Sequence, residues 1–276
     1  MRKDPEDLAL LNILRQCEAK EKIPLIDYIT DSGNGRLSLN DNSKKTLVSA
    51  KSDEKKFNDA VNQLVIKEIQ SFGGNSLVNL MRLGKGVSYD EIVRDVASKV
   101  GAKVTSIANC EAMENAITAK IIEKAWDKMS PQERKTMTES MNIPAKGPAT
   151  LAAVLAAAEL GGFATFRLAA IVANALAKQI IGKGLTFGAN AALMEGVGVL
   201  VGPVGWAVMA LWLAADLAGP AYRVTVPCVI QIAYLRQTIA IKNIKTCPQG
   251  HPQKDLNAKF CSTCGAPIAA PLLQNT

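Results

Sequence analysis

The chain has 276 residues, 48% of them hydrophobic, and a formal net charge of +7. This length and composition exclude a disordered chain and supply enough apolar side chains for one large domain or two modest ones. The cationic excess permits contact with phosphates or anionic lipids, but basic and acidic residues alternate along most of the chain, as on an ordinary solvated surface.

The N-terminal residues predict a short amphipathic helix followed by a turn-rich segment. Asp4 and Pro5 are typical of a helix start, and Leu8 begins an apolar stripe at helical spacing. A polar linker is expected at residues 38–56, so that a first helical unit spans residues 1–42. The charged start of the chain has neither an apolar core nor a cleavage site, and we therefore expect no signal peptide and a cytoplasmic location.

Residues 43–145 predict a central helical domain. Apolar residues from Phe57 to Phe72 repeat at helical spacing, and a pair of glycines then ends that helix. Two capping boxes, which start at Ser88 and Ser130, open further helices, and a longer helix is expected between them from about Cys110 to Met129. Strand signals are few, so the sequence indicates an all-α fold.

Residues 146–240 are the most apolar part of the chain and predict an Ala- and Gly-rich helical hairpin packed with the preceding helices. The stretch from Ala149 to Ala177 is expected as a single helix, and the twenty residues from Gly196 to Ala215 carry no charge. A charge-free run of that length matches a bilayer core. Glycines at a spacing of four would let another helix approach closely, and a tryptophan near one end would suit a membrane interface. The residues expected to contact lipid are Gly198, Gly202, Pro203, Gly205, Trp206 and Trp212.

Composition allows two interpretations of this hairpin. In the first, it inserts into or lies against the inner face of the cell membrane, because globular cores rarely need so long a run without charge. In the second, it is the buried core of a soluble protein, because the glycines and Pro203 weaken a spanning helix. A hairpin leaves both of its ends in the same compartment, and basic residues on its two flanks favour the cytoplasmic side for them, namely Lys178 and Lys183 before it and Arg223 and Arg236 after it.

The C-terminal residues 244–268 predict a small zinc ribbon. Cys247 and His251 form one pair of ligands, Cys261 and Cys264 form the other, and nine residues separate the pairs. Zinc prefers thiolate and imidazole ligands, and these four side chains would close a tetrahedral Cys₃His shell without an open position for catalysis. The expected cofactor is therefore one structural Zn²⁺, which would hold together a module too small to have its own core.

Five motifs follow one another along the chain between Asp7 and Gln237. They are QSFGGNSL at 70–77, YDEIVRDV at 89–96, WDKMS at 126–130, GPVG at 202–205 and AYRVTVP at 221–227. Together they resemble the YaaW family of bacterial proteins, which is grouped remotely with ubiquinol-cytochrome c chaperones. The resemblance implies no catalytic residues. It also gives no support to the zinc ribbon, which is an addition to the shorter members of the family.

The sequence does not indicate an enzyme, because its one histidine is assigned to zinc and no histidine-based triad or acid–base pair remains. The main hypothesis is a membrane-associated or membrane-inserting protein whose hairpin contacts lipid and whose ribbon docks a protein. The alternative is a soluble chaperone or assembly factor, with a protein client or self-association through the hairpin. A nucleic-acid-binding ribbon is the weakest hypothesis, because the ribbon offers only Lys254, Lys259 and Phe260 for such contacts.

Overall fold

The structure is a computed structural model that describes residues 5–36, 39–73, 87–141, 150–159, 161–186, 197–216, 222–242, 245–246, 252–253, 259–261 and 264–267. The regular structure of these residues is helical apart from two strands of two residues each, which confirms the predicted all-α class. In chain order the elements are α1 (Pro5–Gln16), α2 (Ala19–Thr30), α3 (Asp41–Ser52), the 3₁₀ helix η1 (Glu54–Lys56), α4 (Asp59–Gly73), α6 (Tyr89–Val100), α7 (Cys110–Trp126), α8 (Pro131–Ser140), α9 (Leu151–Glu159), α10 (Phe163–Ile180), α11 (Val197–Asp216), α12 (Tyr222–Lys242), β1 (Lys245–Thr246) and β2 (Pro252–Gln253).

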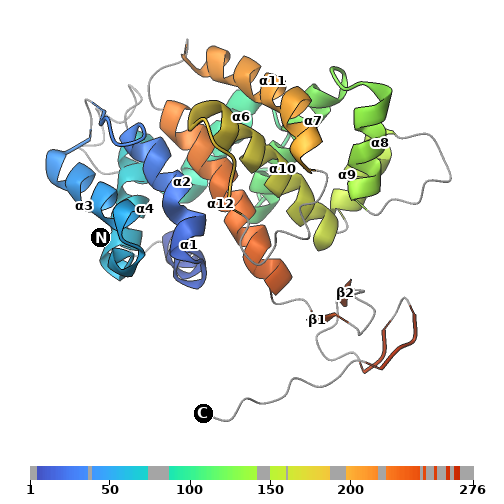
Figure 1. Ribbon diagram of the computed structural model, residues 1–276, viewed down its shortest axis with the longest axis horizontal. Helices are drawn as coiled ribbons and strands as arrows, with labels where there is room; N and C mark the ends of the chain where they lie inside the picture. The colour runs from blue at the N-terminus through green and yellow to red at the C-terminus, as the bar shows by residue number, and fades with distance from the viewer. Residues whose placement is uncertain are drawn as a thin grey trace.

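Helix α12 is the central element of the helical part. It lies between α2 and α10 in Figure 1, and it also contacts α1, α4, α6, α7 and α11. Every residue from Val224 to Leu235 is buried, which explains why this segment is mostly apolar on all sides, and its buried Gln231 donates to the Glu21 carbonyl on α2 at 3.0 Å. Among the described residues, α12 is the one helix long and apolar enough to cross a membrane, and 78% of its apolar window is buried inside the protein.

The segment 38–56 is not the polar linker that the sequence suggested, because it contains α3 and η1. Asn40 caps α3, since its side-chain oxygen accepts a hydrogen bond from the Asn42 N–H at 2.8 Å. Leu47 and Ala50 are the buried residues of α3, and the helix packs against α2 and α4. Two buried apolar side chains, together with an ion pair between Lys51 and Asp27 of α2, thus dock a helix whose overall composition is polar.

The predicted helix starts of the central region are confirmed. Ser88 accepts a hydrogen bond from the Glu91 N–H at 3.4 Å at the start of α6. At the start of α8, Ser130 accepts one from the Glu133 N–H at 3.3 Å, and its own N–H donates to the Glu133 carboxylate at 2.8 Å. These local contacts satisfy N–H groups that a helix leaves without partners at its first turn.

The stretch from Ala149 to Ala177 does not form the single helix predicted for it. Helix α9 ends at Glu159 and α10 begins at Phe163. Gly161 and Gly162 lie between them with φ angles of 78° and 72°, a region that side chains with a Cβ rarely adopt, so the glycines permit the break. Beyond it, every residue of α10 from Ala164 to Ala177 is buried except Arg167, against α7, α11 and α12.

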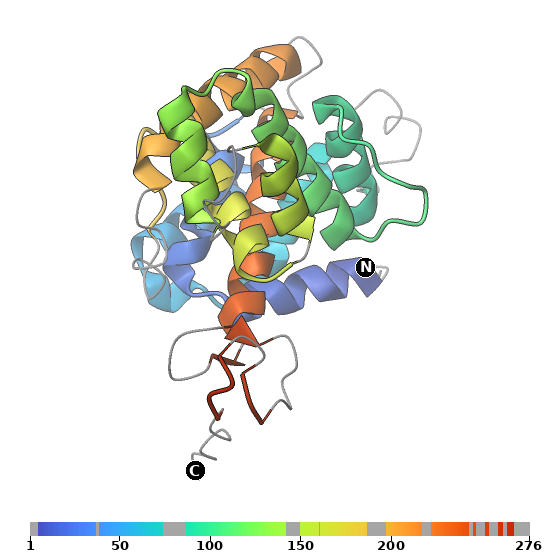
Figure 2. The same ribbon diagram turned by 90° about the vertical axis from the view of Figure 1, so that its right-hand side faces the viewer.

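The two short strands lie beyond the C-terminal end of α12, outside the helical part of the molecule (Figure 2). They pair antiparallel, with Lys245 opposite Gln253 and Thr246 opposite Pro252. In the sequence, Cys247 directly follows β1 and His251 directly precedes β2.

Candidate functional site

Helix α11 presents two different faces. It packs against α7, α8, α10 and α12, and its buried apolar side chains are Leu200, Val201, Val204, Ala207 and Val208. The opposite face carries Gly198, Gly202, Trp206 and Ala210, all of them exposed. Because a spacing of four residues is close to one helical turn, these four residues form one continuous strip, here called the α11 strip.

The α11 strip is open, uncharged and dominated by one aromatic ring. The side chain of Trp206 is 75% exposed. Apart from the neighbouring residues and backbone of α11 itself, no atom of the described residues lies within 4 Å of the position that a Cβ would occupy on Gly198 or on Gly202. A tryptophan ring next to small residues forms an apolar surface that another apolar helix or a lipid interface could cover.

The six residues predicted to contact lipid divide into three groups. Gly198, Gly202 and Trp206 lie on the α11 strip. Pro203 and Gly205 are buried, and a Cβ on Gly205 would stand 2.6 Å from Nε2 of Gln179 on α10, a contact that a shift of this flexible side chain would relieve. The side chain of Trp212 lies outside the described residues.

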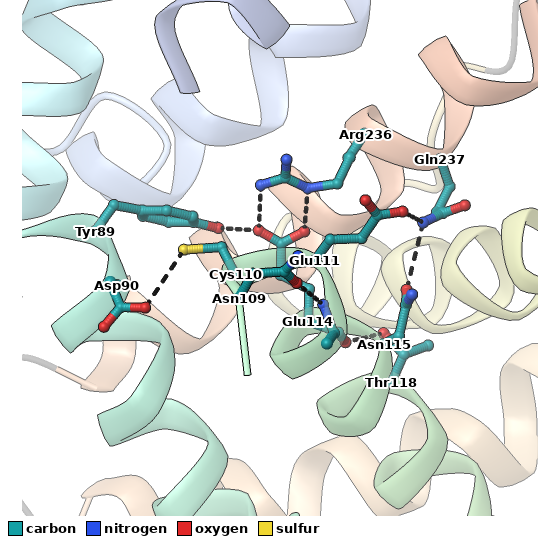
Figure 3. Close-up of polar contacts among 11 residues, drawn as sticks. Tyr89, Asp90, Asn109, Cys110, Glu111, Glu114, Asn115, Thr118, Arg236 and Gln237 are labelled. Carbon is teal, nitrogen blue, oxygen red and sulfur yellow. Dashed lines mark hydrogen bonds and ion pairs between the residues drawn. The ribbon is translucent and has the colours of Figure 1, made fainter. Parts of the chain in front are cut away.

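A buried ion pair fixes α12 against α7 (Figure 3). Arg236 donates from Nε to Glu114 Oε2 at 2.7 Å and from Nη2 to Glu114 Oε1 at 2.9 Å. The Tyr89 hydroxyl on α6 donates to the same Oε1 at 2.9 Å. Burial opposes the charge of Arg236, but its hydrogen bonds with the Glu114 carboxylate outweigh burial and raise the pKa of Arg236. One carboxylate therefore joins three helices.

Further polar contacts follow along the C-terminal half of α12. Gln237 donates from Nε2 to Glu111 Oε1 at 3.2 Å and to Asn115 Oδ1 at 3.4 Å, both on α7 (Figure 3). At the last residue of α12, Lys242 donates to Glu21 Oε1 on α2 at 3.2 Å. These contacts set the register of α12 against its neighbours, a task that nonspecific apolar packing performs less strictly.

The sequence analysis did not identify this network, and it interpreted Arg236 only as a flanking cation. A signal was present in α7, where Glu114 falls on the stripe formed by Cys110, Met113 and Ile117. A carboxylate on an otherwise apolar stripe needs a buried partner. Its partner lies 122 residues further along the chain, a separation that no local pattern indicates.

Three cysteines lie buried in the helical part of the protein, namely Cys17, Cys110 and Cys228. Burial raises the pKa of Cys17 to about 12, and it also raises the pKa values of Cys110 and Cys228. Since the thiolate is the reactive form, we expect iodoacetamide at pH 8 to leave all three unmodified in the folded protein and to modify them in guanidinium. Peptide mapping by mass spectrometry measures this, and rapid labelling of any of the three without denaturant would contradict it.

The structure describes two of the four predicted zinc ligands. Cys247 and His251 lie outside the described residues, whereas Cys261 is buried and Cys264 is exposed in a turn. Within the described part of the chain, no three His, Cys, Asp or Glu side chains are grouped so that they could hold a metal ion. Two of the four predicted ligands lie outside that part of the chain.

The described residues thus form an all-α fold in which buried polar contacts hold the central helix α12 and one face of α11 is apolar and exposed. The sequence profile of the ubiquinol-cytochrome C chaperone family matches residues 59–230. A UPF0174 protein of Helicobacter pylori strain J99 is 33% identical over 230 residues, which make up 82% of this chain and 90% of the relative. The UPF0174 protein YaaW of Escherichia coli strain K12 is 27% identical over 187 residues, or 66% of this chain and 73% of the relative.

The chain therefore belongs to the ubiquinol-cytochrome C chaperone family and groups with the UPF0174 proteins, which confirms the resemblance to YaaW. No solved structure matches it. The profile match includes Glu114 and Trp206 but ends before the predicted zinc ligands, so it bears on the helical part of the chain alone.

Proposed function

We propose that this protein is a non-enzymatic, chaperone-like assembly factor that binds an apolar helix of a client protein along the α11 strip. The observation that carries the proposal is the 75% exposure of Trp206 on a helix whose other face is packed. Membership of a family described as ubiquinol-cytochrome C chaperones supports the chaperone-like role. The predicted cytoplasmic location is part of the same proposal.

The composition of the α11 strip favours an apolar helical client. The strip carries no charge, so a charged segment would lose hydration there without gaining a partner. Gly198 and Gly202 leave room for a second backbone to approach, and Trp206 would then pack along the side of the bound helix. Truncation of a tryptophan at the centre of an interface typically costs about 2 kcal/mol or more, equivalent to roughly thirtyfold in affinity.

A non-enzymatic role agrees with the state of the buried ionisable groups. Glu114, Arg236 and Tyr89 bind one another across three helices, and Lys242 pairs with Glu21. Burial keeps the three core thiols protonated. The polar groups therefore hold the helices together, the thiols are in their unreactive form, and we assign none of these groups to a reaction.

Replacing Trp206 by aspartate is expected to weaken client binding at least about tenfold, because the change removes the main apolar contact and adds a charge. The probe is heat-unfolded citrate synthase, whose aggregation is followed by light scattering. The concentration of protein that halves the scattering is compared between the wild type and Trp206→Asp. Circular dichroism should show the same helical signal in both proteins.

Ile107 provides the matched control, since it is an apolar residue that is 92% exposed and lies outside α11, in the connection between α6 and α7. Ile107→Asp should suppress aggregation as well as the wild type does. Equal behaviour of the two variants would overturn the assignment of the α11 strip. If the wild type and Ile107→Asp were dimers and Trp206→Asp were a monomer, the α11 strip would bind a second copy of this chain.

Association with a membrane surface is the second candidate, and the observation that favours it is again the uncharged strip with an exposed tryptophan, a residue common at lipid interfaces. In this form of the original hypothesis only the surface of α11 meets lipid, because the apolar residues of α10 and α12 are buried. Flotation with phosphatidylglycerol vesicles tests it. Flotation of the wild type but not of Trp206→Asp, with aggregation of citrate synthase unaffected by either protein, would favour lipid over a client.

A further inference from the structure

The turn around Cys261 has the hydrogen bonds of a metal-binding knuckle. The Cys264 N–H donates to Cys261 Sγ at 3.4 Å, and the Gly265 N–H donates to the Cys261 carbonyl at 2.9 Å. Gly265 has a φ of 71°, a conformation that glycine adopts without strain. The Cys261 N–H in turn donates to the Ala266 carbonyl at 2.8 Å. A backbone N–H directed at a sulfur stabilises its thiolate, which is the form that binds metal.

The same turn is closed by a second contact, and most of its described residues are exposed. Phe260 and Pro267 form an antiparallel bridge across it. The ring of Phe260 is 65% exposed, and Lys259, Cys264 and Gly265 are exposed as well. A turn with so little buried apolar surface needs another source of stability, and in small modules that source is commonly a disulfide or a metal ion.

The strand pair β1–β2 places side by side the two residues that adjoin the other predicted ligands in the sequence. Thr246 lies opposite Pro252, and the chain between them contains Cys247 at its first position and His251 at its last. Two paired residues on each side are too few to keep a hairpin folded in water. The hairpin therefore needs a further source of stability, as the Cys261 turn does. One metal ion bound to both segments would supply it.

We propose that Cys247, His251, Cys261 and Cys264 bind one structural Zn²⁺ that joins the β1–β2 hairpin to the Cys261 turn. Three thiolates and one imidazole fill a tetrahedral shell, so the ion has no open position and no catalytic role. The metal would link two segments whose described residues form no shared core, and its binding energy would be the folding energy of the ribbon. This inference is independent of the function proposed for the α11 strip.

The test is the zinc content of the full chain, purified without chelator and measured by elemental mass spectrometry. We expect about one zinc per chain in the wild type and less than about a tenth of that in Cys261→Ala. Cys17→Ala is the matched control, because Cys17 is a buried cysteine of the helical part. It should keep its zinc. Wild-type protein without zinc, or equal loss in both variants, would overturn the proposal.

Cobalt identifies the ligands even if a variant has a less stable ribbon. The Co²⁺-substituted chain should show the strong visible bands of a tetrahedral site and the near-ultraviolet charge-transfer bands of thiolate ligands. His251→Cys should retain tetrahedral bands with added thiolate character, whereas weak octahedral bands in the wild type would exclude the Cys₃His shell. Circular dichroism should show unchanged helices in all of these variants, since the ribbon lies beyond α12.

Discussion

Replacing Glu114 by alanine is expected to lower the free energy of unfolding by about 3–5 kcal/mol, the typical cost of leaving one member of a buried ion pair without its partner. Glu114 is almost completely buried and accepts two hydrogen bonds from Arg236 and one from Tyr89. Its loss leaves a guanidinium and a hydroxyl without an acceptor at the junction of α6, α7 and α12. Urea unfolding followed by circular dichroism measures the change.

Two further variants separate the ion pair from the packing around it. Replacing both partners by apolar residues, as in Glu114→Leu/Arg236→Met, should recover much of the lost stability, because no uncompensated charge remains. Adding Tyr89→Phe should recover more, since the Tyr89 hydroxyl otherwise lacks its acceptor. If the double variant were as unstable as Glu114→Ala, the loss would come from packing and the ion-pair explanation would be wrong.

The exposed pair of Arg15 and Asp59 provides the control for charge removal. Arg15 Nε donates to Asp59 Oδ1 at 2.9 Å, and about half of each side chain is accessible to water. Water can replace the partner of an exposed ion, so Arg15→Met should change the unfolding midpoint little. A large loss of stability in Arg15→Met would mean that burial is not what distinguishes the Glu114–Arg236 pair.

The sequence predicted best those features that depend on neighbouring residues. Ser88 and Ser130 cap their helices through residues three positions away, so the signal and the contact lie in the same short segment. The α3 helix was missed because its polar composition outweighed a good cap at Asn40. The break at Gly161 and Gly162 was missed because the long apolar run on both sides of it appeared continuous.

The candidate site was predictable only in part, because its properties depend on which face of α11 is packed. The apolar run that contains Gly198, Gly202 and Trp206 was evident in the sequence, and so was the ambiguity between core and lipid contact. Hydropathy counts apolar residues without regard to their neighbours, and it could not show that Val204 is covered while Trp206 is exposed. Because the family is described as chaperones, our proposal assigns the exposed face to a client and keeps lipid as the second candidate.

Aspartate at Val204 should destabilise the protein far more than aspartate at Trp206, although the two positions are only two residues apart on α11. Val204 is fully buried, so Val204→Asp places a short charged group in the core and should cost about 3–5 kcal/mol of folding free energy. Trp206 is exposed, and Trp206→Asp should change the stability by no more than about 0.5 kcal/mol. Urea unfolding of both variants measures the difference.

This comparison also separates the two interpretations of the apolar hairpin. If the inward face of α11 packs permanently against α10, Val204→Asp destabilises the protein in water whether or not vesicles are present. If that face instead turned outward to meet lipid, the aspartate would mainly abolish vesicle binding, and the protein in water would keep much of its stability. A stable Val204→Asp variant that no longer binds vesicles would therefore restore membrane insertion as the leading function, and an unstable one would leave the α11 strip as the surface at which this protein meets its partner.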